Sequence, residues 1–84
     1  MQATSSFVNI AAYKFVTFDD TAEKRPAFLE RCQSLGLKGT VLLSPEGINL
    51  FLAGTRAAID GFLSWLRSDA RFADIEVKES LSDD

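Results

Sequence analysis

The residue types that this 84-residue sequence lacks narrow the chemistry open to it. There is no histidine, which removes the usual general base near neutral pH and the commonest metal ligand. The only cysteine, Cys32, can form neither an internal disulfide nor the thiolate cluster that zinc or an iron–sulfur centre requires. We therefore expect no catalytic residue, no metal and no cofactor in this chain.

Cys32 is the one residue that could serve as a nucleophile, so its placement decides whether covalent chemistry is open to the chain. Phe28 and Leu35 recur at helical spacing on either side of it, which puts the cysteine on the apolar stripe of a helix. Burial in apolar surroundings raises the pKa of a thiol and makes it unreactive. We expect a core cysteine.

The composition is that of one small globular domain spanning residues 1–84. Hydrophobic residues make up 46% and aromatic residues 11% of the chain, which excludes a disordered chain. No apolar run approaches the roughly 20 residues of a membrane span, and the first six residues lack the basic region of a secretory signal. Together with a free cysteine, these features predict a cytoplasmic protein without a membrane partner.

The net charge of −3 is unevenly distributed along the chain. Residues 1–42 carry five basic and four acidic side chains (+1), whereas residues 43–84 carry four basic and eight acidic ones (−4). A protein that binds nucleic acid by itself normally presents a basic surface, so the charge argues against that function for this chain alone. The first half of the chain, however, need not repel phosphate.

Six stretches have the pattern of regular secondary structure. Alternating or β-branched residues predict strands at residues 7–18, 38–44, 48–53 and 75–78. A first helix is expected to end at Gly36, with Pro26 in its first turn, where a missing N–H is harmless. A second helix, from Arg56 to about Ser68, is capped by Thr55. The polar segment Ser80–Asp84 is expected to fray.

The order β-α-β-β-α-β predicts a ferredoxin-like two-layer sandwich of the α+β class. In this fold a four-stranded antiparallel sheet carries both helices on one face, and the first and third strands are central. The turn Ser44–Gly47 is expected to join the second and third strands, because proline presets φ and glycine tolerates the conformation of a hairpin exit.

The two central strands are apolar on both sides, although the helices of such a sandwich cover only one. The second side carries four aromatic residues, Phe7, Tyr13, Phe15 and Phe51, of which the last three are the candidates for a contact with another domain. Exposed apolar patches on monomers are usually small, so we expect something to cover this face. A chain tail or loop, or a contact between copies, would suffice. We favour the next segment of a longer chain.

Residues 38–54, KGTVLLSPEGINLFLAG, resemble the N-terminal domain signature of a bacterial rhodanese-related family, the oxygen-dependent tRNA uridine hydroxylases and their sulfurtransferase relatives. The shared pattern is a Gly-Thr-led strand, then Glu-Gly-Ile-Asn, then a strand ending in Ala-Gly. The matching positions are Gly39, Thr40, Glu46, Gly47, Ile48, Asn49, Ala53 and Gly54. Further matches on both flanks extend the similarity over nearly the whole chain. Leu50-Phe51 departs from the pattern, since many members carry Gly-Thr there.

The resemblance implies a non-catalytic accessory domain that precedes a C-terminal rhodanese domain in the same chain and acts in tRNA wobble-uridine hydroxylation. The catalytic cysteine loop of such proteins lies in the rhodanese domain, so the 84 residues alone are expected to be inactive. Their expected task is to position tRNA or to brace the catalytic domain.

Glu46, Asn49 and Lys78 are the remaining polar candidates. From spacing alone, Glu46 is a solvated turn residue and Asn49 hydrogen-bonds its own hairpin. Lys78, between two glutamates on an edge strand, is a charge that blocks aggregation. The resemblance implies instead that Glu46 and Asn49 contact tRNA or the catalytic domain, with Lys78 as a further contact residue.

Other functions share this topology. An acylphosphatase-like enzyme needs an arginine and backbone amides around a phosphate just after the first strand, but Thr17–Thr21 is acidic and lacks glycine. An RNA-recognition module would stack bases on Tyr13 or Phe15 and on Phe51, although residues 47–52 lack its basic pattern. A weak RNA-binding module, or a stand-alone interaction or oligomerisation module using the open sheet face, therefore stays as an alternative.

Overall fold

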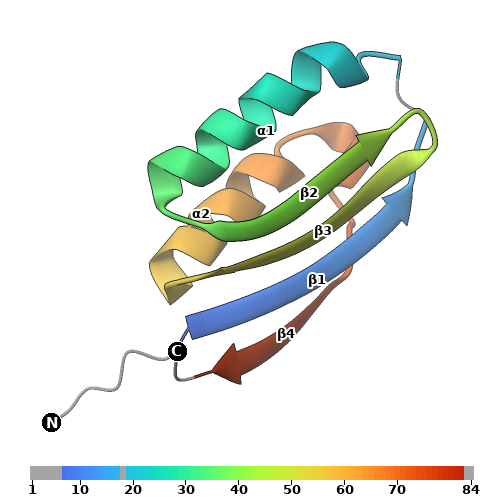
Figure 1. The fold of residues 1–84 in the computed structure, drawn as a ribbon. Helices are drawn as coiled ribbons and strands as arrows, with labels where there is room; N and C mark the ends of the chain where they lie inside the picture. The colour runs from blue at the N-terminus through green and yellow to red at the C-terminus, as the bar shows by residue number, and fades with distance from the viewer. Residues whose placement is uncertain (1–6, 18, 83–84) are drawn as a thin grey trace, which may run out of the picture.

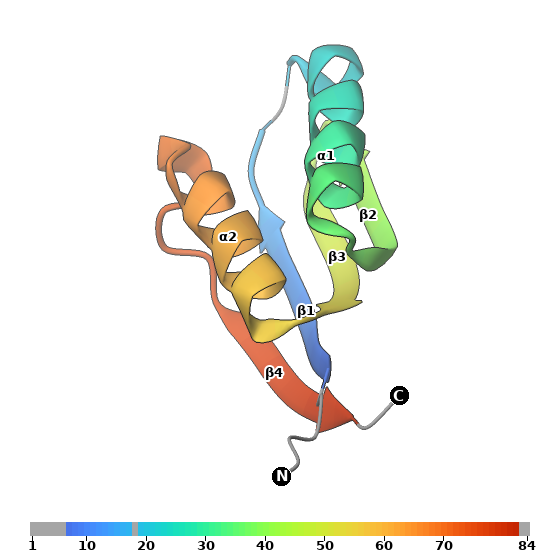
Figure 2. The same cartoon turned by 90° about the vertical axis from the view of Figure 1, so that its left-hand side faces the viewer.

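A computed structural model describes residues 7–17 and 19–82 of the chain. The elements are β1 (Phe7–Phe15), α1 (Thr21–Leu35), β2 (Lys38–Ser44), β3 (Gly47–Gly54), α2 (Arg56–Arg67), a 3-10 turn η1 (Ala70–Phe72) and β4 (Val77–Ser82). Both helices lie side by side on one face of the sheet (Figures 1 and 2). The predicted β-α-β-β-α-β sandwich is confirmed.

The sheet is antiparallel throughout, with the strand order β2-β3-β1-β4. The central position of β1 and β3, predicted from the ferredoxin-like topology, is therefore confirmed. The hairpin at Ser44–Gly47 joins β2 to β3 and pairs Ser44 with Gly47.

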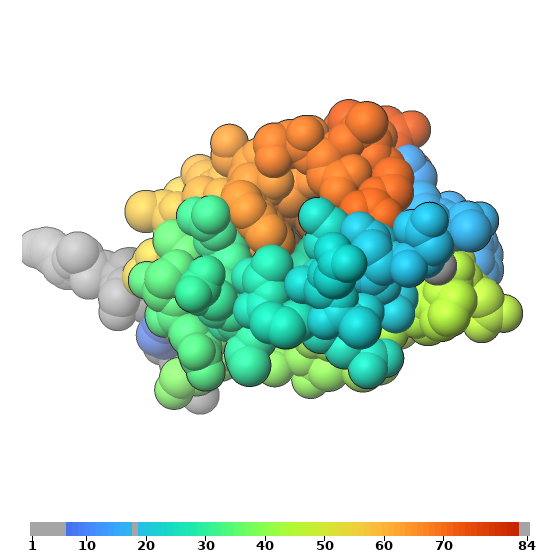
Figure 3. All heavy atoms as spheres, turned by 90° about the horizontal axis from the view of Figure 1, so that it is seen from above, coloured from blue at the N-terminus to red at the C-terminus, as the bar shows by residue number. Residues whose placement is uncertain are grey.

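The hydrophobic core fills the space between the helices and the inner face of the sheet. In the view of Figure 3 the side chains of α1 and α2 close over this space. Its buried residues are Val8, Ile10, Ala12, Phe28, Cys32, Leu43, Ile48, Leu50, Leu52, Ala58, Ile59, Phe62, Leu63, Leu66, Phe72 and Ile75. No helix within the described ranges is long and apolar enough to cross a bilayer.

Helix α1 begins at Thr21, so the placement of Pro26 in its first turn was wrong. The carbonyl of Asp20 accepts hydrogen bonds from the N–H groups of Glu23 and Lys24 at 3.1 and 3.0 Å, which anchors the first turn ahead of the proline. Pro26 therefore lies inside the helix. It is solvent-exposed, so the carbonyl that loses its partner can turn to water. Gly36 ends the helix as predicted, with φ of 70°.

Helix α2 begins as the sequence indicates. The Thr55 hydroxyl accepts a hydrogen bond from the N–H of Ala58 at 3.1 Å, which satisfies one of the donors that the first turn leaves without an intrahelical acceptor. The helix ends at Arg67, one residue before the predicted end.

The first and last strands have different bounds from those predicted. β1 ends at Phe15, and Phe18 lies outside the described residues. β4 runs over Val77–Ser82 because its partner on β1 is Phe7–Ala12, with Val77 opposite Ala12. Ile75 is buried but belongs to the exit from η1, where its N–H bonds the carbonyl of Phe72 at 3.1 Å. The expected fraying was thus wrong for residues 80–82, while residues 83–84 lie outside the description.

Candidate functional site

The candidate site is the sheet face opposite the helices, which we call the open face. Its side chains come from alternate residues of the four strands, and the strand pairing fixes which of them are neighbours. Starting at the hairpin, and reading each row from β2 towards β4, the first row is Ser44, Gly47 and Phe15, and the second is Leu42, Asn49 and Tyr13. The third row is Thr40, Phe51, Ala11 and Lys78, and the fourth is Lys38, Ala53, Asn9 and Ser80.

Large apolar side chains gather at the hairpin end and the middle of the open face. Tyr13, Phe15 and Phe51 are 62%, 75% and 55% exposed, and Leu42 is 58% exposed. The rings of Tyr13 and Phe15 meet edge to face, with centroids 5.1 Å apart. The structure thus brings together the three predicted aromatic residues. It adds Leu42, which sequence reasoning missed although the alternation of residues 38–44 could have found it.

Glu46 lies at the tip of the hairpin, and only its backbone is fixed. Its N–H donates to the Ser44 hydroxyl at 3.3 Å, and its carbonyl accepts a hydrogen bond from the N–H of Val16 at 3.1 Å. The carboxylate is exposed and has no ion pair with any described residue. Its turn position is as predicted, and the side chain is available to a partner.

Asn49 stands in the centre of an apolar row, between Leu42 on β2 and Tyr13 on β1. Its side chain is exposed and makes no hydrogen bond within residues 7–17 and 19–82, so the hairpin is tied by Ser44 instead. Glu46 and Asn49 line the same shallow depression, of about 320 Å³, together with Tyr13. The two polar candidates therefore lie next to the aromatic residues.

Lys78 also projects from the open face, but from its other half. It lies opposite Ala11 in the register and lines a depression of about 650 Å³ with Phe51, Tyr13 and Asn49. Lys38, on the far edge strand β2, was not singled out from the sequence, although its place two residues before Thr40 puts it on the same face.

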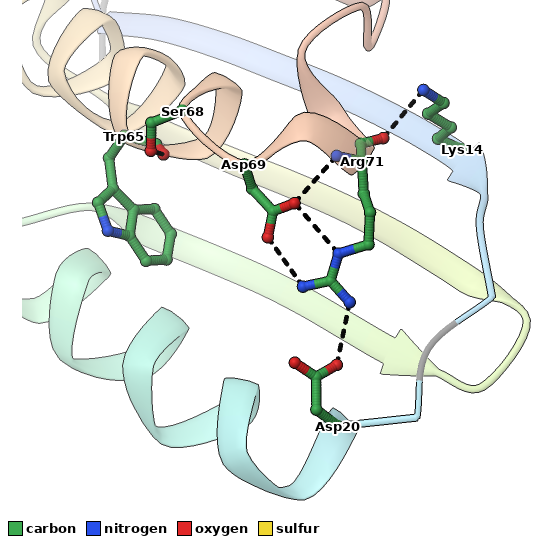
Figure 4. A network of polar contacts seen from close by, with 6 residues as sticks. All are labelled: Lys14, Asp20, Trp65, Ser68, Asp69 and Arg71. Atoms are coloured by element: carbon green, nitrogen blue, oxygen red, sulfur yellow. Dashed lines mark hydrogen bonds and ion pairs between the residues drawn. The ribbon is translucent and has the colours of Figure 1, made fainter.

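The loop after β1 is held by a network around Arg71 on the helical side of the sheet (Figure 4). The Arg71 guanidinium donates to both carboxylate oxygens of Asp69, at 3.1 and 2.8 Å, and to Asp20 at 3.0 Å. Lys14 donates to the carbonyl of Arg71 at 2.9 Å and forms an ion pair with Asp74. The network ties the start of α1 to the turn after α2.

These contacts shift the pKa values of the groups involved. Hydrogen bonds from Arg71 hold the pKa of Asp69 at about 2 and lower that of Asp20 below its ordinary value. Hydrogen bonds to Asp69 and then Asp20 raise the pKa of Arg71 further. Both carboxylates are thus charged at neutral pH, and the arginine is occupied by them.

Cys32 lies in the core as predicted. Burial raises the pKa of its thiol, which keeps the sulfur protonated and inert. Across the described part of the chain, no group of three or more cysteine, aspartate and glutamate side chains is arranged to hold a metal ion.

The sequence profile of the UPF0176 acylphosphatase like domain matches residues 7–84. The chain belongs to this family. It is also similar to longer proteins named tRNA uridine(34) hydroxylase. That of Cupriavidus necator is 70% identical over 76 residues, which are 90% of this chain and 27% of the relative. That of Bordetella avium is 67% identical over 79 residues (94% and 33%), and that of Paraburkholderia xenovorans 58% identical over 82 residues (93% and 29%). The chain thus spans only about a quarter to a third of these relatives.

The network around Arg71 shows how this UPF0176 domain differs from an enzyme that cradles phosphate after its first strand. An arginine does lie beside that loop, but two aspartates already use its donors. A phosphate there would have to displace Asp20 and then face the charge of Asp69. In this domain the arginine beside the loop after β1 is thus engaged by two carboxylates.

Proposed function

We propose that this domain is the non-catalytic N-terminal accessory domain of a tRNA uridine hydroxylase, and that its open face docks onto the catalytic domain of the same longer chain. The observation that carries the proposal is the apolar cluster of Tyr13, Phe15 and Leu42, each more than half exposed on a face that no described element covers. The relatives are about three times as long as this chain, which leaves room for such a domain. The resemblance described above makes it a rhodanese-like domain that carries the catalytic cysteine.

Docking at Tyr13 and Phe15 is favoured because burying these exposed aromatic side chains removes apolar surface from water. Aromatic side chains contribute most to interface energies when they become fully buried. Tyr13 and Phe15 already support one another edge to face, so little side-chain freedom is lost when a partner covers them. The depression beside them also offers Glu46 and Asn49 as polar contacts.

We assign Glu46 and Asn49 to the contact with tRNA or with the catalytic domain at the hairpin end. Neither side chain has a partner among the described residues, and a turn tip contributes little packing. Replacing both by alanine in the full-length protein lowers tRNA modification and leaves the fold intact under this proposal. The isolated 84-residue chain neither hydroxylates uridine nor transfers sulfur, because Cys32 is buried. We place the protein in the cytoplasm, where tRNA and a reduced cysteine are both found.

The test compares a pair of exposed aromatic residues on the open face with one exposed leucine on the helical face, in the full-length protein. Tyr13→Ser with Phe15→Ser removes the cluster on the open face. Leu29→Ser, on α1, removes a side chain of similar exposure (60%) from the helical face. Uridine-34 modification is measured in cells that depend on each variant, with protein levels checked in parallel.

We expect the open-face variant to lose most of its modification and to become sensitive to protease between the two domains, whereas Leu29→Ser behaves like the parent. Normal modification by a stably expressed protein that lacks residues 1–84 would overturn the accessory role. If the isolated chain dimerises through Tyr13 and Phe15 instead, the open face is an oligomerisation surface, which is the alternative function.

A further inference from the structure

The open face changes its chemistry along the strands. Away from the hairpin, beyond the apolar cluster, lies a third hollow of about 470 Å³, which we call the lysine hollow. Its open-face lining comes from all four strands: Asn9 and Ala11, Lys38, Phe51, and Lys78 with Ser80. Tyr13 and Phe15, the residues proposed to dock, do not line this hollow.

The lysine hollow is positively charged although the chain is acidic. Lys38 and Lys78 extend from opposite edges of the sheet, and neither has an ion pair with a described residue. One carboxylate, Glu79, also lines the hollow, but both its oxygens accept hydrogen bonds from Arg56 of α2 at 3.1 and 3.2 Å, so its charge is already paired. Glu76 lines the neighbouring depression and not this one.

The floor between the two lysines suits a flat ring. Ala11 and Ala53 leave the sheet surface low there, and Phe51 rises beside them with more than half of its surface exposed. Asn9 is held in place by donating from its amide nitrogen to the Ser82 hydroxyl at 3.0 Å. The hollow thus combines an exposed aromatic ring, a fixed amide and two cations.

We propose that the lysine hollow binds a short single-stranded segment of RNA, with backbone phosphates at Lys38 and Lys78 and one base stacked on Phe51. The backbones of the two lysines are separated by three strand spacings, about 14 Å, and by one row along the strands. Each lysine can therefore contact a different phosphate of the same strand. Bases stack readily on aromatic side chains of central strands.

The nature of the RNA rests on the proposed function, since the relatives are named for a tRNA substrate. The basic residues come from the edge strands. A search for basic and aromatic residues within β3 alone could not find the site, because Lys38 and Lys78 are 40 positions apart in the sequence.

The experiment is a fluorescence-anisotropy titration with labelled single-stranded oligouridylate of about eight nucleotides. It is carried out on this chain and on the full-length protein, between about 50 and 200 mM salt. Lys38→Gln with Lys78→Gln tests the phosphate contacts, and Phe51→Leu tests stacking. The control, Lys24→Gln with Arg31→Gln, removes the same charge from α1 on the helical face.

We expect the Lys38/Lys78 variant to bind about tenfold more weakly and its salt dependence, d log K/d log[salt], to flatten by about 1.4, or 0.7 for each lost phosphate contact. Phe51→Leu should weaken binding about fivefold or more without changing that slope. The control pair should stay within about twofold of the parent protein.

Equal losses in the control pair and the Lys38/Lys78 pair would overturn the proposal, as would undetectable binding at the lowest salt. Competition by poly-glutamate as effective as by RNA would show an acidic protein partner instead. These outcomes are independent of domain docking, which is read from Tyr13 and Phe15 by tRNA modification and proteolysis. Failure of one proposal therefore leaves the other standing.

Discussion

Gly39, at the start of the family signature, is a backbone requirement, and its replacement by alanine gives the sharpest test of the fold. The residue lies on β2 with φ of 130°, a backbone conformation that residues other than glycine rarely adopt. A Cβ at this position would stand 1.9 Å from the carbonyl oxygen of Phe51 and 2.9 Å from its carbonyl carbon. Both atoms belong to the backbone of the central strand β3, which cannot move aside without breaking the sheet.

The cost of Gly39→Ala follows from these two effects. Backbone strain at an unfavourable φ costs about 1–3 kcal/mol, and overpacking a fixed site costs a further 1–3 kcal/mol or so. The sum, about 2–6 kcal/mol, compares with a total stability of roughly 4–12 kcal/mol for a domain of this length. The variant should therefore lose a large share of its stability.

The matched control is Gly61→Ala on α2. Gly61 is exposed, and the nearest atom to an added Cβ is a methyl carbon of Leu35 at 3.6 Å, an ordinary contact. Alanine is a better helix former than glycine, so this variant should gain about 0.5–1 kcal/mol. Replacing glycine by alanine should thus lower the stability at position 39 and raise it at position 61.

Urea unfolding, followed by the fluorescence of Trp65, measures both effects. The indole packs edge to face on Phe28 at a centroid distance of 4.9 Å, so its emission reports on the core. With a slope of about 1–3 kcal/mol per molar urea, Gly39→Ala should lower the midpoint by about 1 M or more. An unchanged midpoint for Gly39→Ala, or a loss of stability in Gly61→Ala, would refute the reasoning.

Three further predictions concern the core, the Arg71 network and a helix cap. Cys32→Ser should cost about 1–3 kcal/mol in the same unfolding assay, because the hydroxyl lacks a partner in the core, and native Cys32 should react with a thiol reagent far more slowly than the unfolded chain. The ion pair of Asp69 contributes to the free energy of unfolding above the ordinary pKa of 3.8, and this contribution is lost as the pH falls through about 2. Arg71→Met should therefore lower the stability at pH 7 and make the stability depend less on pH between pH 4 and 2. An acid-unfolding profile like that of the parent protein would contradict this. Thr55→Ala should cost about 1 kcal/mol, and Thr55→Ser should recover most of it in thermal unfolding.

Local patterns in the sequence were sufficient to predict the fold. The period of two in residues 38–44 and 48–53 separates the core side from the open side of β2 and β3, and the helical period in residues 56–67 identifies the buried stripe of α2. Thr55 and Gly36 mark helix ends through contacts within a few residues. The aromatic residues of the open face follow from the same alternation, which is why they could be named in advance.

The features that the sequence alone could not give depend on contacts between distant segments. The bounds of β4 are set by the length of its partner on β1, so the alternation at Ile75 gave the wrong start. The start of α1 depends on how the loop before it is held, where Asp20 meets Arg71, 51 positions further along the chain. Lys38 and Lys78 lie on opposite edges of the sheet and share a hollow only once four strands are paired. Periodicity specifies which side of an element is buried, but only tertiary packing specifies which elements become neighbours and which charges they bring together.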